Sequence, residues 1–170
     1  EMKILITGGL GNVGISTLEE LLNRGHHVRC VDLKTRANVR KARRLAQRIA
    51  EMPGQIEITW GDMRRSDDLL AAVQGQDAVV HLAFIVPKLS ATGVECEAEP
   101  VWAREINVSG TRNLIEAMRA QKRPPRLLFA SSYHIYGLTQ GQVPPLTLAH
   151  PVRLGRDHRK RRRCGRRCLG

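Results

Sequence analysis

The chain has 170 residues, enough for one domain with a buried core, and its longest apolar stretch, residues 78–86, is too short to span a bilayer. Four irregularly spaced cysteines and the lack of a secretory signal argue against a disulfide framework and predict a cytoplasmic protein. The net charge of +12 comes mainly from residues 152–170, where nine Lys or Arg and one Asp give +8. Residues 1–151 are only mildly basic, so the charge of the tail is interpreted separately.

The first predicted element is a short apolar strand, residues 3–7, that leads into glycines at positions 8, 11 and 14. Gly8 allows a tight turn, Gly11 allows a pyrophosphate to approach the backbone, and Gly14 allows the next helix to pack closely on the strand. The free amides and positive dipole at the start of that helix suit a diphosphate. The pattern therefore predicts a dinucleotide site, with an ordinary strand-to-helix turn as the alternative.

The helix after the glycines has an apolar spacing and a glycine at its end. Its apolar positions are Val13, Ile15, Leu18, Leu21 and Leu22, and Gly25 is predicted to cap its C-terminus.

A second predicted strand, residues 27–31, ends at Asp32. A carboxylate at this place would accept both hydroxyls of an adenosine ribose, which favours NAD over NADP. Lys34 and Arg36 lie near enough in the sequence to hold a 2′-phosphate instead. A solvated loop aspartate is the structural alternative for Asp32.

The remaining elements alternate between helix and strand. Apolar spacing and breaker residues predict three further helices, over 38–50, over 66–73 with Ser66 as cap, and from 100 or 101 to about 119. They predict three further strands, over 56–60, 78–82 and 127–130. Residues 84–98 have no clear period and are predicted to form a loop. The alternation predicts a Rossmann-like, doubly wound parallel sheet with helices on both faces. We expect one domain over residues 1–151 and a basic, disordered tail over 152–170.

Residues 3–151 resemble the extended branch of the short-chain dehydrogenase/reductase family, the group of NAD-dependent sugar epimerases, dehydratases and related reductases. The resemblance implies that Asp62 and Met63 lie at the adenine, that His81, Leu82 and Ala83 line the loop beside the cofactor, and that Asn107 helps to order the active site. Taken singly, Asp62 also suits a turn cap, Asn107 an ordinary helix position and His81 a hydrogen-bonded core histidine. The implied NAD site comprises Gly8, Gly11, Asn12, Val13, Gly14, Asp32, Asp62, Met63, Leu82, Ala83 and Asn107.

The segment 131–137 resembles the serine segment of the family and places Ser132 as the active-site serine. The implied chemistry is hydride transfer at a hydroxyl or carbonyl carbon of a small-molecule, sugar-nucleotide-like substrate, whose oxygen Ser132 would bind. The family uses a Tyr-x-x-x-Lys motif as its proton shuttle, but no tyrosine follows Tyr136 in this chain. Four residues before Lys160 stands Arg156, which does not deprotonate.

The family-like sequence ends near residue 154 and arginine-rich sequence follows. We interpret this change as a frameshift or gene truncation that leaves the C-terminal part of the fold and the substrate lobe absent. Tyr133 and Tyr136 either replace the missing base or pack around the serine loop. Sequencing the gene beyond codon 154 tests the frameshift hypothesis.

Three functions remain open at the level of sequence. The first is the cofactor-binding portion of an NAD-dependent epimerase/dehydratase, a group that is commonly homodimeric. The second is a non-catalytic NAD-binding sensor or interaction module. The third takes the tail as a non-specific nucleic-acid arm rather than a disordered run of like charges. No metal site is predicted, because His158, Cys164 and Cys168 are irregularly spaced.

Overall fold

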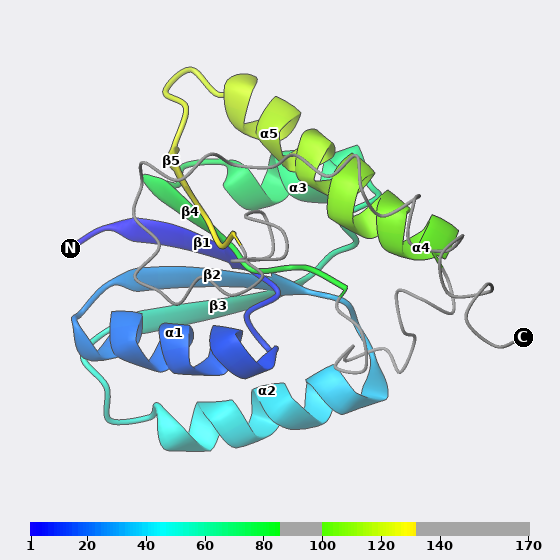
Figure 1. Ribbon diagram of the computed structural model, residues 1–170. Helices are drawn as coiled ribbons and strands as arrows, with labels where there is room; N and C mark the ends of the chain where they lie inside the picture. The colour runs from blue at the N-terminus through cyan, green and yellow to red at the C-terminus, as the bar shows by residue number, and fades with distance from the viewer. Residues whose placement is uncertain (86–99, 132–170) are drawn as a thin grey trace, which may run out of the picture. The chain divides into compact units, whose positions relative to one another are not determined.

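The computed structural model describes residues 1–85 and 100–131, and the described residues of Glu1–Ala130 belong to one compact unit. Five parallel strands form a sheet in the order β3-β2-β1-β4-β5 (Figure 1). They are β1 (Lys3–Thr7), β2 (His27–Asp32), β3 (Gln55–Trp60), β4 (Ala78–His81) and β5 (Arg126–Phe129). The predicted strands are confirmed to within one residue at each end. The order reverses between β1 and β4, and such a switch opens a crevice at the carboxyl ends of the strands.

Helices cover both faces of the sheet (Figure 1). On one face lie α1 (Asn12–Asn23) and α2 (Arg36–Arg48), and on the other lie α3 (Ser66–Val73) and a long helix. The long helix consists of α4 (Pro100–Arg104), a π-helical turn η1 (Glu105–Gly110) and α5 (Thr111–Arg119). The predicted doubly wound, Rossmann-like fold is confirmed, and the π turn is a feature that the apolar spacing did not indicate.

The central strand β1 contributes to two cores, because successive side chains of a strand point to opposite faces. Ile4 and Ile6 pack with Leu18, Leu22 and other residues of the α1 and α2 side. Leu5 packs on the other side, in a cluster with residues of α3 and α5. Burial on both faces explains why β1 is a continuous apolar run.

The ends of α1 and α2 follow from local capping. Gly25 has φ +76° and closes α1 with two hydrogen bonds, from its own N–H to Leu22 O at 3.0 Å and from His26 N–H to Leu21 O at 3.1 Å. The predicted cap is therefore confirmed as a Schellman motif. The predicted start of the second helix was late: α2 begins at Arg36, because the Thr35 hydroxyl accepts a hydrogen bond from Asn38 N–H at 3.0 Å.

Two sequence predictions about helix faces and caps are wrong. Val13 is 67% exposed, so it does not belong to the buried face of α1. Ser66 is the first residue of α3 rather than its cap; Arg65 is the N-cap residue, and its side chain makes no capping hydrogen bond with the described residues. The Asp68 carboxylate instead accepts a hydrogen bond from Asp62 N–H at 3.0 Å, which joins α3 to the loop before it. Among the described residues no helix combines the length and apolar character needed to cross a membrane.

Candidate functional site

A cleft of about 370 Å³ lies at the carboxyl ends of β1, β2 and β4. Nine residues of the predicted cofactor site line it: Gly8, Gly11, Asn12, Val13, Gly14, Asp32, Met63, Leu82 and Ala83. Seven further residues that sequence reasoning did not select complete the lining: Val31, Leu33, Asn38, Gly61, Phe84, Ile85 and Ile106. Asp62 and Asn107 are not among the lining residues. Ser132 lies outside the described residues.

The glycine turn forms one wall of the cleft, and each of its glycines is required for a different steric reason. Gly8 has φ +70°, and a Cβ atom there would lie 2.7 Å from the Ala83 Cα. A Cβ on Gly14 would lie 2.4 Å from Gly8 O, so Gly14 packs on the turn itself rather than on the strand as predicted. Gly9 also has a role that the spacing rule missed, because a Cβ there would lie 2.6 Å from Cys30 Sγ.

Gly11 occupies the N-cap position of α1, and no side chain in the described part of the protein caps this end. The first amides of a helix have no partner within the helix, and the helix dipole is positive there. Gly11, Asn12 and Val13 all line the cleft. The start of α1 is therefore available to an anionic group in the cleft.

Asp32, at the end of β2, accepts three hydrogen bonds within the protein. Its Oδ2 accepts from Leu10 N–H at 3.0 Å, and its Oδ1 accepts from Leu33 N–H at 2.8 Å and from Asn38 Nδ2 at 3.0 Å. Burial raises the pKa of Asp32, and these hydrogen bonds and the charge of Lys41 oppose the rise. A carboxylate has about four acceptor positions, so this arrangement leaves about one, on Oδ2, for a ligand.

Two residues of α2 complete this corner. Asn38 donates to Asp32 and, at 2.9 Å, to Leu33 O, which fixes the orientation of its amide. Its Oδ1 is buried and meets no hydrogen-bond donor in the described part of the chain. Lys41 Nζ donates to Leu10 O at 2.9 Å, so Asp32 and Lys41 hold the backbone of Leu10 from both sides. The contact between Lys41 and Leu10 joins residues 31 positions apart, and sequence spacing carries no signal for it.

The wall after β4 is held by a chain of hydrogen bonds through His81. The Thr111 hydroxyl donates to Asn107 O at 2.8 Å, so its oxygen accepts from His81 Nε2 at 2.9 Å. His81 Nδ1 then accepts from the Thr7 hydroxyl at 2.6 Å, and Thr7 Oγ1 accepts from Ala83 N–H at 3.3 Å. In a neutral imidazole this pattern places the proton on Nε2.

His81 is 2% exposed, and burial lowers its pKa to about 4. The structure therefore supports the alternative of a hydrogen-bonded core histidine. Leu82 and Ala83, the next two residues, reach the cleft.

Asn107 lies in the π turn and joins the long helix to the same wall. Its Oδ1 accepts from Ile85 N–H at 2.7 Å, and its Nδ2 donates to Ile85 O at 2.9 Å. The side chain of Asn107 thus binds both the backbone N–H and the backbone C=O of Ile85. Asn107 is a positioning residue for the cleft in this arrangement, and Ile85 is the residue that lines it.

The wall after β3 comes from the segment 61–63. Met63 is buried and lines the cleft, whereas the Asp62 carboxylate turns to Arg64, with Oδ2 at 2.6 Å from Nη2. The hydrogen bond from Arg64 lowers the pKa of Asp62. The side chain of Asp62 thus stabilises the turn, as the structural alternative proposed, while its neighbours Gly61 and Met63 face the cleft.

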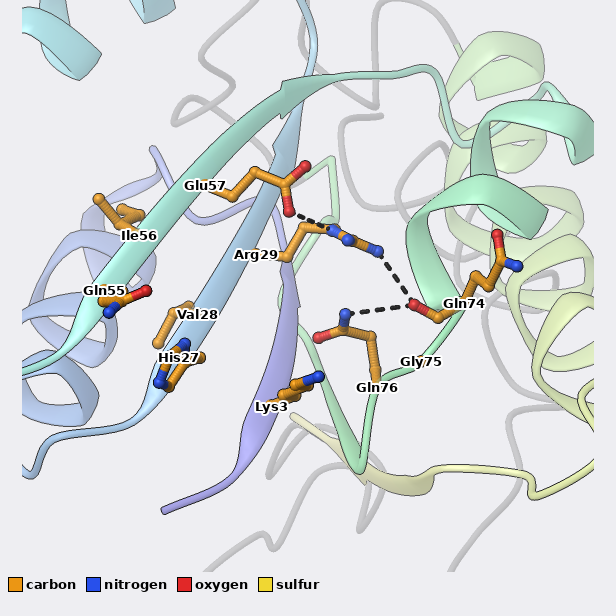
Figure 2. A pocket seen from close by; sticks show the side chains of 10 residues that line it. All are labelled: Lys3, His27, Val28, Arg29, Gln55, Ile56, Glu57, Gln74, Gly75 and Gln76. Atoms are coloured by element: carbon orange, nitrogen blue, oxygen red, sulfur yellow. Dashed lines mark hydrogen bonds and ion pairs between the residues drawn. The ribbon is translucent and has the colours of Figure 1, made fainter.

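A second, polar cavity of about 280 Å³ lies at the opposite edge of the sheet, at the amino ends of β1 and β2 (Figure 2). Arg29 binds both a carboxylate and backbone carbonyl groups there: its Nε donates to Glu57 at 2.7 Å and its Nη1 donates to Ala72 O at 2.9 Å and Gln74 O at 3.2 Å. These contacts fasten β2 to the end of α3. In parallel α/β sheets ligands bind at the carboxyl ends of the strands, so the cleft rather than this cavity is the candidate site.

The reversal of strand order and the glycine-lined cleft place the described domain in the Rossmann-like α/β class. A sequence model described as the NAD dependent epimerase/dehydratase family matches residues 4–158. The chain belongs to this family, as the resemblance implied.

Individual relatives agree with this assignment. A bifunctional UDP-glucose 4-epimerase and UDP-xylose 4-epimerase of Pisum sativum is 36% identical over 138 residues, which is 79% of this chain and 38% of that protein. A 3β-hydroxysteroid dehydrogenase/Δ5→4-isomerase of Mycobacterium tuberculosis is 34% identical over 68% of this chain and 28% of its own length. The chain thus spans less than half of each of these two relatives.

Among solved structures, a UDP-glucose-4-epimerase from Stenotrophomonas maltophila with bound NAD and formylated UDP-arabinopyranose is similar to this chain. The TM-score is 0.67 and the sequence identity 29%, over 81% of this chain and 39% of that one.

Proposed function

We propose that this chain binds NAD in the cleft at the carboxyl ends of β1, β2 and β4, as the cofactor-binding portion of an epimerase/dehydratase-type oxidoreductase. The observation that carries the proposal is the glycine turn at the start of α1. Gly11 lines the cleft without a side chain at the free end of a 12-residue helix, where a pyrophosphate would meet amide donors and a positive dipole.

The other lining residues fit the rest of the cofactor. Asp32 keeps about one acceptor position for a ribose hydroxyl. Apolar side chains of Val31, Met63, Leu82 and Ile85 offer surfaces for the two rings. NAD, when bound, supplies a hydride acceptor or donor, and the residues of this chain bind and orient it.

We infer a preference for NAD over NADP from the same corner. A 2′-phosphate would lie against the Asp32 carboxylate, and this charge repulsion opposes its binding. Lys34 and Arg36, which follow β2, are the residues that would favour NADP instead. We expect NADH to bind more tightly than NADPH, and equal affinities would contradict the preference.

We propose a nucleotide sugar as the substrate class of the complete enzyme, since the pea relative and the Stenotrophomonas structure both concern UDP-sugars. The mycobacterial relative makes a steroid the second class. The role of Ser132 as the residue that binds the substrate oxygen stays a prediction. Because no tyrosine follows Tyr136, we expect this chain to bind NAD without turnover.

Titration of the chain with NADH, followed by nicotinamide fluorescence, tests the binding proposal. Gly11→Val places methyl groups in the cleft and should abolish saturable binding. Ala50→Val adds bulk at an exposed position just beyond α2 and should leave binding unchanged. If Gly11→Val binds NADH as tightly as the wild type, the cleft is not the cofactor site.

A separate measurement tests each of the two other functions, the non-catalytic sensor and the nucleic-acid arm. Hydride transfer with any nucleotide sugar would contradict a non-catalytic sensor. Deletion of residues 153–170 tests the nucleic-acid arm, which requires that duplex binding and its salt dependence fall when the tail is removed.

A further inference from the structure

Two walls of the cleft, the one after β3 and the one after β4, are held by the same long helix. Asn107 of η1 holds Ile85 in the wall after β4. Asn113 of α5 holds the wall after β3, because its Nδ2 donates to Met63 O at 3.1 Å. Met63 and Ile85 both line the cleft, and each is held through its backbone by an asparagine side chain of that helix.

Gly110 provides the space that lets Met63 pack on this helix. It is buried at the end of η1, and a Cβ atom there would lie 2.8 Å from Met63 Cβ. This distance is shorter than real Cβ contacts, so a side chain at position 110 would displace Met63. Met63 is 6% exposed and packs in the core cluster with Leu114, Ala117 and Met118, which leaves it little room on the helix side.

The segment around Met63 has few other anchors on the helix. Arg64 Nη1 lies 3.9 Å from Glu105 Oε2, and both side chains are about half exposed, so this ion pair contributes little. The hydrogen bond from Asn113 and the close contact with Gly110 therefore hold Met63 on the helix, together with its apolar packing in the core cluster.

We propose that Asn113 and Gly110 are positioning residues for the adenine half of the cofactor, acting through Met63, while Asn107 positions the nicotinamide half through Ile85. This inference rests on the proposed function. It predicts that the affinities for ADP and for NADH respond differently to changes at the two asparagines.

Isothermal titration with ADP and with NADH tests the proposal on the full chain. Asn113→Ala removes the hydrogen bond to Met63 O and should lower the affinities for ADP and for NADH by the same factor, about fivefold. Asn107→Ala should weaken NADH by a similar factor and leave ADP unchanged. Glu116→Ala, at an exposed position of α5, should change neither affinity.

Gly110→Ala should displace Met63 by steric crowding rather than by loss of a hydrogen bond. Alanine favours a helix more than glycine does, so a loss of ADP affinity in this variant is not explained by a weaker helix. All titrations are made at a temperature where the circular dichroism of each variant matches that of the folded wild type.

The outcomes separate the inference from the proposal on which it rests. If the wild type binds neither ADP nor NADH, the proposed function fails and the inference fails with it. If the wild type binds both, and Asn113→Ala and Gly110→Ala bind ADP like the wild type, the inference alone is overturned. A loss of ADP affinity in Asn107→Ala equal to that in Asn113→Ala would also overturn it.

Discussion

His81 Nδ1 lies 2.6 Å from the hydroxyl oxygen of Thr7, at paired positions of the neighbouring strands β4 and β1. Its Nε2 lies 2.9 Å from Thr111 Oγ1 on α5. The imidazole therefore connects the two central strands to the long helix, and Ala83 N–H joins the same chain of hydrogen bonds through Thr7. Burial keeps the ring neutral at neutral pH, and with Nε2 donating to Thr111 the neutral ring accepts from the Thr7 hydroxyl at Nδ1.

We expect the stability of the protein to fall as the pH drops from 6.5 to about 4. Burial lowers the pKa of His81 to about 4, so the unfolded chain takes up a proton before the folded protein does. The stabilisation is complete above pH 6.5 and is lost as the pH approaches 4. A pKa shift of this size corresponds to a difference of about 3 kcal/mol in the free energy of unfolding between the two ends of this pH range. Urea denaturation at a series of pH values measures it.

The variant His81→Gln isolates this effect. The raised pKa of Asp32 has the opposite effect, because it makes acidification favour the folded protein. Arg64 lowers the pKa of Asp62, so the contribution of Asp62 to stability is lost only as the pH falls below 3.8. Both contributions persist in the variant, which should be less stable than the wild type at pH 7 and lose less stability on acidification. Parallel pH profiles of the two proteins would contradict the assignment of His81.

Gly14→Ala should destabilise the protein, by about 1–3 kcal/mol, because the new methyl group meets backbone carbonyl oxygens that cannot move aside. These are Gly8 O at 2.4 Å and Gly9 O at 2.5 Å from the added Cβ. Chemical denaturation measures the change. NADH titration should show weaker binding, because the displaced turn forms one wall of the cleft.

Gly25→Ala is the matched control for this glycine. Nothing lies within 4 Å of a Cβ at position 25, so only the positive φ of +76° opposes the substitution. We expect a cost of about 1 kcal/mol and unchanged NADH binding. If Gly25→Ala impaired NADH binding as strongly as Gly14→Ala, the crowding argument for Gly14 would fail.

Asn38→Asp should destabilise the corner beside Asp32 more at pH 8 than at pH 5. The substitution replaces a donor to Asp32 Oδ1 by a carboxylate oxygen, which brings two negative charges together in a buried place. We expect a loss of about 3 kcal/mol at pH 8 and a smaller loss at pH 5, because two like charges in a buried place raise the carboxyl pKa values and a lower pH favours protonation of one of them. Asn38→Ala removes the same hydrogen bonds without the charge, and its cost should not depend on pH in this way.

Arg29→Ala should lower stability without changing NADH affinity, because Arg29 lies at the edge of the sheet opposite the cleft (Figure 2). It leaves the carbonyl groups at the end of α3 and the Glu57 carboxylate without their donor, at a cost of about 1–2 kcal/mol. Glu57→Gln, at a half-exposed position, should cost under about 1 kcal/mol. A loss of NADH affinity in Arg29→Ala would show that the two edges of the sheet are coupled.

The sequence alone determined the strands, the doubly wound fold class and the glycine turn. These features depend on local information: alternating burial, helical spacing and residues that allow a turn are readable within about a dozen residues. For the same reason the turn glycines that line the cleft and Asp32 at the end of its strand could be selected in advance, whereas Met63, Leu82 and Ala83 were selected through the family resemblance.

Only the tertiary structure decided the roles of His81 and Asn113. Each acts through a hydrogen bond with a partner far away in the chain, His81 with Thr7 at a separation of 74 residues and Asn113 with Met63 at a separation of 50. Nothing in the residue type announces such a partner, because an asparagine or histidine on a predicted element suits the surface as well as the core. The walls of the cleft are built from these long-range contacts, which exist only once the sheet and the long helix have packed together.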